Sequence, residues 1–266
     1  MARLIFLGTS GSTAVTSRQL RSSGGIILQV EELQLHIDPG PGSLNKAKEY
    51  GVNPNHTNAI LVTHNHINHC NDLNAVIEAM THAGLEHRGI LLASKSILQP
   101  TEGHPFLTTY HKSLLERCVP LEKNHKIALD LVEINALPAQ HTDPTAIGFK
   151  IFCPQFTISY TGDTVLTPEL LDGLTGSDIL ILNVPYLTKK AMGQNLDMET
   201  ALHIVNAIKP RLAILTHFGA DLIKADPLIE AREIQRITGV QTIAAYDGLT
   251  IAPGGWETLK SPVKGY

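Results

Sequence analysis

The run Leu61-Val62-Thr63-His64-Asn65-His66-Ile67-Asn68-His69 contains three histidines that directly follow a short apolar segment. Such a segment predicts a buried strand, and a loop after its end can bring His64, His66 and His69 toward one point. Imidazole nitrogens are ligands for zinc, iron, manganese and nickel. The alternative is a polar loop that contains histidines by chance, and further ligands elsewhere in the chain argue against it.

Three more candidate ligands each stand just after a short apolar segment. They are His141, Asp163 and His217. Taken alone, each is more typical of a structural histidine or a turn aspartate. Together they repeat one arrangement, in which a strand delivers a polar side chain at its end, and α/β folds place their functional groups at such ends. The sequence therefore predicts one metal site that unites these residues with the first three histidines.

Short segments rich in Val, Ile and Phe predict the strands that must position this site. They are Leu4–Leu7, Gly25–Val30, Leu33–Ile37, Ala59–Val62, Ile90–Ala93, Ile127–Ile134, Ile147–Phe152, Phe156–Tyr160, Asp178–Leu182, Leu212–Leu215 and Gln241–Ala245. Apolar residues at helical spacing predict helices over Asn71–His82, Asp197–Ile208 and Pro227–Ile237. No linker rich in Gly, Pro or Ser interrupts these elements, which favours one α/β domain over residues 1–266.

The segment from Ser94 to Pro120 is less regular than the rest of the chain. It contains prolines, a glycine and three side chains that could act on a substrate, namely His104, Tyr110 and His111. Tyrosine and histidine near a metal can stabilise an oxyanion or protonate a leaving group. We expect residues 94–120 to form a lid or an inserted loop over the site, although packing at the surface is an equally ordinary role for these side chains.

The composition limits the class of protein. Hydrophobic residues make up 43% of the 266 residues and charged residues 17%, which predicts a large core rather than disorder. The net charge of −4 gives no general attraction to nucleic acid. Three cysteines without a CxxC spacing favour a reducing compartment, and no apolar run is long enough to span a bilayer. We expect a cytoplasmic protein without a membrane partner, and its oligomeric state is left open.

The order of the candidate ligands resembles the metallo-β-lactamase superfamily, whose pattern is HxHxDH followed by His, Asp and His. The resemblance covers nearly the whole chain and implies a four-layer αββα sandwich. The ribonuclease Z-like branch is the most similar. Phe6-Leu7-Gly8-Thr9-Ser10-Gly11-Ser12 resembles the glycine-rich start of that branch, and Ile37-Asp38-Pro39-Gly40 resembles its second motif, in which the aspartate braces the site.

The resemblance also implies a division of ligands. One metal is expected on His64, His66 and His141, and a second on residue 68, His69 and His217. Asp163 is expected to bridge the two. A shared carboxylate suits this place, because one negative charge offsets two nearby cations. We expect one or two divalent transition metals, with zinc first and iron or manganese as alternatives. The implied reaction is hydrolysis by a metal-activated hydroxide.

The chain departs from the family pattern at Asn68, which replaces the aspartate of HxHxDH. A carboxylate ligand supplies charge and accepts a proton, whereas an amide offers only a neutral oxygen. Three hypotheses follow: one tight and one labile metal, compensation by Asp72, or loss of hydrolysis with metal binding retained. For Asp72 the simpler interpretation is a residue at a helix N-terminus.

The interval between His141 and Asp163 has room for only two strands and a turn. Ribonuclease Z proper carries a long tRNA-binding arm there. The missing arm and the net negative charge argue against tRNA processing as the main role and favour a small-molecule or short phosphodiester substrate.

The leading functional hypothesis is therefore a metal-dependent hydrolase, with a phosphodiesterase favoured. A lactonase or thioesterase on the same scaffold is one alternative, and a non-catalytic metal-binding protein is another, because of Asn68. Asp163, Asn68, His111 and Tyr110 are the candidate catalytic residues. Asn183, just past a predicted strand, is a further side chain that could point inward, although packing at the surface or in a loop is its more ordinary role.

Overall fold

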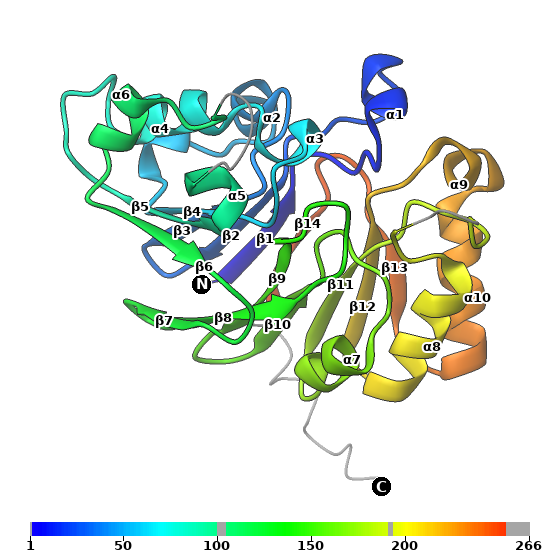
Figure 1. The fold of residues 1–266 in the computed structure, drawn as a ribbon. Helices are drawn as coiled ribbons and strands as arrows, with labels where there is room; N and C mark the ends of the chain where they lie inside the picture. Colours follow the sequence, from blue (N-terminus) through cyan, green and yellow to red (C-terminus); the bar gives the residue numbers. More distant parts are fainter. Residues whose placement is uncertain (1, 100–104, 191–193, 254–266) are drawn as a thin grey trace, which may run out of the picture.

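A computed structural model describes residues 2–99, 105–190 and 194–253. Two sheets of seven strands lie face to face (Figure 1). The first contains, in spatial order, β14 (Thr250–Ile251), β1 (Ala2–Phe6), β2 (Ile26–Val30), β3 (Leu33–Ile37), β4 (Ala59–Val62), β5 (Ile90–Ser94) and β6 (Arg117–Leu121). The second contains β13 (Thr242–Ala244), β12 (Leu212–Thr216), β11 (Ile179–Asn183), β10 (Thr157–Tyr160), β9 (Ile147–Phe152), β8 (Val132–Pro138) and β7 (Lys126–Leu129).

Helices cover the outer face of each sheet, as Figure 1 shows. Those of the first half are α1 (Thr13–Ser17), α2 (Ser43–Glu49), η1 (Pro54–His56), α3 (Ile67–Cys70), α4 (Leu73–Met80), α5 (Lys95–Leu98) and α6 (Thr109–Ser113). Those of the second half are α7 (Pro168–Leu174), α8 (Met198–Ile208), α9 (Ala220–Ala225) and α10 (Pro227–Thr238). The expected four-layer αββα sandwich is confirmed. Within the described residues, no helix is long and apolar enough to cross a membrane.

Strand β4 shows why the central strands are apolar throughout. Ala59 and Leu61 face the core between the two sheets, while Ile60 and Val62 face the core beneath α4. A strand that is buried on both faces reads as a continuous apolar run rather than as an alternation. The same property made most strands recognisable in the sequence.

Two sequence expectations about elements are wrong. The run Ile127–Ile134 is a hairpin rather than one strand: β7 ends at Leu129, β8 begins at Val132, and Asp130 between them adopts a positive φ of 50°. No glycine or asparagine marks this turn in the sequence, so the two strands appeared continuous.

The described part of residues 94–120 is not a lid but part of the fold. It supplies strand β6, which pairs in parallel with β5, and buried Leu107 and Leu115. Pro120 lies within β6, where a proline is tolerated because this strand is at the edge of its sheet. The proline obscured the strand in the sequence. His104 lies outside the described residues.

Candidate metal centre

Most candidate ligands follow the carboxyl ends of parallel strands, whereas His141 follows β8, which pairs antiparallel with β7 and β9. In the first sheet β3 pairs in parallel with β4, which places Asp38 beside the start of the loop that carries His64. In the second sheet β10, β11 and β12 run in parallel, and Asp163 and His217 follow two of them. Parallel strands end at the same edge of a sheet, so these loops meet between the two halves of the molecule.

Close backbone packing explains two glycines of the N-terminal motifs. A side chain on Gly11 would collide with the main-chain carbonyl of His217, and one on Gly40 would collide with that of Asn68. Asp38 and His217 themselves adopt left-handed φ values of 51° and 63°, which are uncommon for residues other than glycine. The motifs therefore hold ligand-bearing backbone in place, in addition to making turns.

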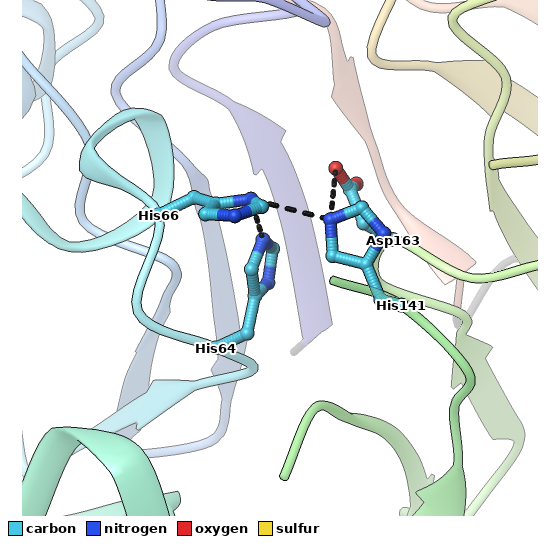
Figure 2. A group of neighbouring side chains, drawn as sticks. All are labelled: His64, His66, His141 and Asp163. Atoms are coloured by element: carbon cyan, nitrogen blue, oxygen red, sulfur yellow. Dashed lines mark hydrogen bonds and ion pairs between the residues drawn. The ribbon is translucent and has the colours of Figure 1, made fainter. Parts of the chain in front are cut away.

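The first group of ligands consists of His64, His66, His141 and Asp163, whose ligand atoms all lie within 4.8 Å of one another. Nε2 of His64 is 3.0 Å from Nδ1 of His66, which in turn is 3.2 Å from Nε2 of His141. Oδ2 of Asp163 is 3.8 Å from Nε2 of His141. Figure 2 shows these four side chains converging.

The second group consists of His69, Asp163 and His217, and all three are buried. Nε2 of His69 is 3.0 Å from Nε2 of His217. Oδ1 of Asp163 lies 3.3 Å from Nε2 of His217 and 3.6 Å from Nε2 of His69. Asp163 thus turns one oxygen toward each group, as the resemblance implied.

Hydrogen bonds on the outer side of the rings fix which nitrogen faces the centre. Thr63 donates its hydroxyl proton to Asp38, so its oxygen accepts from Nδ1 of His64 at 2.9 Å. Nδ1 of His69 donates to Oδ2 of Asp38 at 2.9 Å. Nδ1 of His141 donates to the carbonyl of Gln194 at 2.9 Å. In each of these three rings Nε2 is therefore the nitrogen that faces the centre, and such outer hydrogen bonds are the usual way in which a protein orients histidines for metal binding.

The donor set fits a divalent metal. Neutral imidazole nitrogens that point lone pairs at one another across about 3 Å repel, unless a cation or a proton lies between them. The first group offers three imidazole nitrogens and one carboxylate oxygen, a set that zinc accepts in tetrahedral sites.

The electrostatics keep most of these donors available. Burial lowers the pKa of His217 to about 4, despite Asp163 nearby, and burial together with His69 holds the pKa of His64 well below its usual value. Burial also lowers the pKa of His69, but Asp163 and Asp38 outweigh it and raise that pKa to about 10. Burial would raise the pKa of Asp163, but His217 and His69 hold it well below normal. The bridging carboxylate therefore stays ionised and attracts cations.

Asn68 lies beside the second group, where the sequence pattern placed it. Its amide nitrogen is 3.2 Å from Nε2 of His217. The oxygen and nitrogen of an amide are assigned from their surroundings, so rotation of the amide would turn its oxygen toward the same place. At either orientation the side chain brings no charge to the group.

Asp72 does not compensate for Asn68. Its Oδ2 accepts hydrogen bonds from the backbone N–H groups of Gly42 and Ser43, each at 2.9 Å. These groups belong to the start of α2, although Asp72 itself precedes α4. The simpler interpretation, a carboxylate at a helix N-terminus, holds, but the helix it serves is not its own.

Tyr110 and His111 are not brought to the centre. His111 forms an ion pair with Glu78 of α4 (Nε2–Oε2, 3.2 Å) and contacts the hydroxyl of Thr108. Tyr110 is 54% exposed. Figure 1 shows their helix, α6, at the outer end of the first half. Neither residue lines the cavities around the metal ligands, so their assignment as catalytic residues is corrected.

Asp38 and Asn183 take the inward positions expected of them, and Tyr160 joins them. The Tyr160 hydroxyl donates to Oδ2 of Asp38 at 2.9 Å, and the Asn183 amide donates to Oδ1 of Asp163 at 2.7 Å. The same amide donates to Tyr160 at 3.1 Å. Sequence reasoning missed Tyr160 because it counted as the last apolar residue of a strand.

Asp143 is a second supporting carboxylate that sequence reasoning missed. It is buried and accepts hydrogen bonds from the backbone of Asn65, from the Ser96 hydroxyl and from the backbone and hydroxyl of Thr145. It therefore ties the loop of His64 and His66 to the loop of His141. Its place two residues after a predicted ligand was the only available signal.

A pocket of about 400 Å³ opens onto the first group. Its wall includes His66, His141 and Asp163, together with residues of the first and second halves. The remaining lining residues are Gly11, Ser12, Thr13, Ile67, Asn68, Thr142, Tyr186, Gln194 and Asn195. A pocket of this volume accommodates a small-molecule substrate.

Known proteins resemble this chain in sequence. A family model described as a beta-lactamase superfamily domain matches residues 34–218. An uncharacterized protein of Methanocaldococcus jannaschii is 32% identical over 251 residues, which cover 93% of this chain and 94% of that protein. A ribonuclease Z of Sulfolobus acidocaldarius is 21% identical over 278 residues, which cover 88% of this chain and 94% of that protein.

Two solved structures share the fold. The metallo-beta-lactamase fold protein YhfI of Bacillus subtilis superposes with a TM-score of 0.76 at 16% identity, covering 94% of this chain and 98% of that chain. A diphosphatase of the PhnP family superposes with a TM-score of 0.73 at 20% identity, covering 95% of this chain and 98% of that chain.

Proposed function

This chain belongs to the β-lactamase superfamily, in its ribonuclease Z-like branch, and from that premise we propose that it is a zinc-dependent phosphodiesterase that acts on small substrates. The observation that carries the proposal is the pair of converging ligand groups that share Asp163, one of which opens onto a pocket of about 400 Å³. The fold implies divalent metal binding and hydrolysis; the metal and the ester class are our proposal.

His64, His66 and His141 would hold one metal, His69 and His217 the other, and Asp163 would serve both. Bound divalent metals supply Lewis acidity and lower the pKa of a coordinated water molecule. Three residues orient the imidazole rings from behind: Thr63 holds His64, Asp38 holds His69, and the Gln194 carbonyl holds His141. The chain thus fixes its donors before a substrate arrives, which is the preorganisation that catalysis requires.

The pocket wall suggests what surrounds the scissile ester. Apart from metal ligands, its described lining residues carry no charge; the polar ones offer hydroxyl or amide groups, such as Tyr186 and Asn195. Such a wall can hydrogen bond to uncharged polar groups, whereas a second phosphate would lack a cationic partner. We therefore favour a diester whose one negative charge lies at the metals and whose flanking groups are uncharged, such as a sugar or a nucleoside.

Two further observations support hydrolysis of a phosphoester bond in a small substrate. Relatives and structural neighbours include a ribonuclease Z and a diphosphatase, both named for hydrolysis at phosphate. Between His141 and Asp163 the chain forms only the short strands β9 and β10, so no arm extends from this interval to grip a folded RNA. Remote binding energy of that kind positions large substrates.

The test compares zinc-loaded protein on a phosphodiester such as bis(p-nitrophenyl) phosphate, a lactone, a thioester and a precursor tRNA. We expect kcat/KM to be highest for the diester, and turnover to disappear in Asp163→Asn. A higher kcat/KM for the lactone or thioester would replace the phosphodiesterase assignment. Efficient site-specific trimming of the tRNA would refute the argument on size, and metal binding without any turnover would favour a non-catalytic role.

A further inference from the structure

Behind the metal centre, the orientation of Asn183 is fixed by its neighbours. One terminal atom of its amide lies 2.7 Å from Oδ1 of Asp163 and 3.1 Å from the Tyr160 hydroxyl oxygen. That hydroxyl gives its own proton to Oδ2 of Asp38, so it can only accept a hydrogen bond from Asn183. The atom that faces Asp163 must therefore be the amide nitrogen. The carbonyl oxygen, Oδ1 of Asn183, then points away, and it is buried without a hydrogen-bond partner.

His217 leaves a second polar atom without a partner. Its Nε2 faces the other donors of the second group, so Nδ1 carries the ring proton. Nδ1 is buried and makes no hydrogen bond, unlike the Nδ1 atoms of His64, His69 and His141. A buried donor without a partner costs roughly 1–3 kcal/mol, so such groups rarely persist unsatisfied.

Both residues line one cavity of about 30 Å³. The parallel register of β11 and β12 sets Asn183 beside Thr216, which precedes His217 and lines the same cavity. His69 of the second group also lines this cavity, and among its lining residues only Asn68 also lines the larger substrate pocket. A cavity needs roughly 10–15 Å³ to hold one water molecule, together with two or more polar partners.

We propose that this cavity is a binding site for one structural water molecule, which accepts a hydrogen bond from Nδ1 of His217 and donates one to Oδ1 of Asn183. One donor and one acceptor are left over, and a single water molecule satisfies both. A cation is a poor occupant, because one of the two groups left without a partner, the N–H of His217, is a hydrogen-bond donor. The inference rests on the metal centre of the proposed function but not on the identity of the substrate.

The water would give His217 the support that the other histidines receive from protein groups. It holds the proton on Nδ1 and so keeps the lone pair of Nε2 directed at the second metal. It also joins Asn183, and through it Asp163, to the same ligand. Outer hydrogen-bond partners of metal ligands typically change metal affinity by about 10–100-fold when they are lost. Asn183 and the water are thus positioning groups for the second metal.

The direct test is a crystal structure of the zinc-loaded protein at a resolution that shows ordered water. We expect one peak within hydrogen-bond distance of both Nδ1 of His217 and Oδ1 of Asn183. An empty cavity in a map that shows other buried waters would overturn the proposal, and so would a peak whose anomalous signal identifies it as a metal ion. This measurement does not depend on turnover, so a failure of the phosphodiesterase assignment leaves it decidable.

A pair of variants tests the consequence. Thr216→Ile places one carbon atom more in the cavity than Thr216→Val, which preserves the size of the threonine side chain. We expect Thr216→Ile to displace the water and raise the Kd of the second metal about tenfold, while Thr216→Val keeps the water and stays within about threefold. Equal Kd values in two folded variants would contradict the role; if Thr216→Ile fails to fold, the crystal structure decides.

Discussion

The two ligand groups share Asp163 but differ in their surroundings. His66, His141 and the shared Asp163 line the substrate pocket, whereas His69 and His217, which belong to the second group alone, are buried and do not line it. The first group has a full set of three histidines beside the shared carboxylate. The second has two, and Asn68 stands where the family has a charged ligand.

The difference suggests that the two groups have different roles, a division of labour in which the first meets the substrate and the second is buried behind supporting residues. A half-buried group that lines a pocket can meet a substrate, but its histidines depend on loops that come from both sheets. A buried group is shielded from water and is held by Asp38 from the first sheet and by Asn183 from the second. We infer that the first group binds metal tightly through its ligands, and that the second depends more strongly on supporting residues. Four predictions test this comparison.

The largest change in metal affinity is expected from a substitution of Asp163, the ligand that the two groups share. Asp163→Asn removes the charge that both groups share, which is the one carboxylate in either set of ligands among the described residues. We expect metal affinity to fall by more than about a hundredfold in both groups, beyond the loss typical of supporting residues. Elemental analysis after gel filtration measures it. Asp221→Asn is the matched control, because Asp221 is an exposed carboxylate that forms an ion pair with Lys190. A variant that retains one full equivalent of zinc would show that the groups are independent.

The strand that supports the second group has a pH-sensitive residue. Burial lowers the pKa of His36 to about 4, although its hydrogen bond to Gly24 and the charges of Asp38 and Asp72 oppose this. In the unfolded chain His36 takes up its proton near pH 6.5, whereas in the folded protein it does so only near pH 4. Protonation of His36 therefore does not oppose folding above pH 6.5, and it lowers the free energy of unfolding as the pH falls from 6.5 toward 4. The loss is about 3 kcal/mol.

His36→Gln should remove this contribution. Glutamine can still donate a hydrogen bond to the Gly24 carbonyl, as Nε2 of His36 does at 2.9 Å. Denaturant unfolding of metal-free protein at pH 7 and pH 4.5 measures the free energy of unfolding. We expect the difference between the two pH values to shrink in the variant. An unchanged difference would mean that other histidines account for the acid sensitivity of this half.

Two buried carboxylates allow the groups to be weakened separately. Asp38 contacts His69 of the second group directly, whereas Asp143 joins the loops that carry the first group. We expect Asp38→Asn to lower the affinity for the second metal by about 10–100-fold. We expect Asp143→Asn to lower mainly the affinity for the first metal. Asp38 also reaches His64 through Thr63, so a smaller effect on the first metal is expected. Calorimetric zinc titration resolves the two events, and identical profiles would contradict the division of labour.

The sequence could predict which side chains come together, because the candidate ligands follow apolar strands and their order resembles the family pattern. Asp38 and Asn183 could be anticipated for the same reason. Tyr160 and the role of Asp143 could not, since their functions depend on partners from distant segments, and hydrogen-bond partners leave no periodic pattern. Residues 94–120 were misjudged because Pro120 concealed an edge strand. Tyr110 and His111 were chosen by chemical type alone, and type without position is weak support.

The smallest expected change in metal affinity comes from a substitution of Asn68, the residue that makes the two ligand groups differ in charge. Asn68→Asp places the negative charge of the family pattern next to His217. The amide nitrogen of Asn68 now lies 3.2 Å from Nε2 of His217. An added carboxylate ligand should tighten the second metal about tenfold, or about 1.4 kcal/mol, and leave the first nearly unchanged. Competition with a chelator of known zinc affinity measures both.

Asn68→Ser is the matched control, because it removes the amide without adding charge, and it should not tighten the second metal. In the unchanged protein, mild chelation should remove one metal before the other, and Asn68→Asp should narrow that gap. If both metals already leave together with Asn68 in place, the amide is an adequate ligand. The burial of the second group and its supports, rather than the charge of its ligands, would then set its affinity.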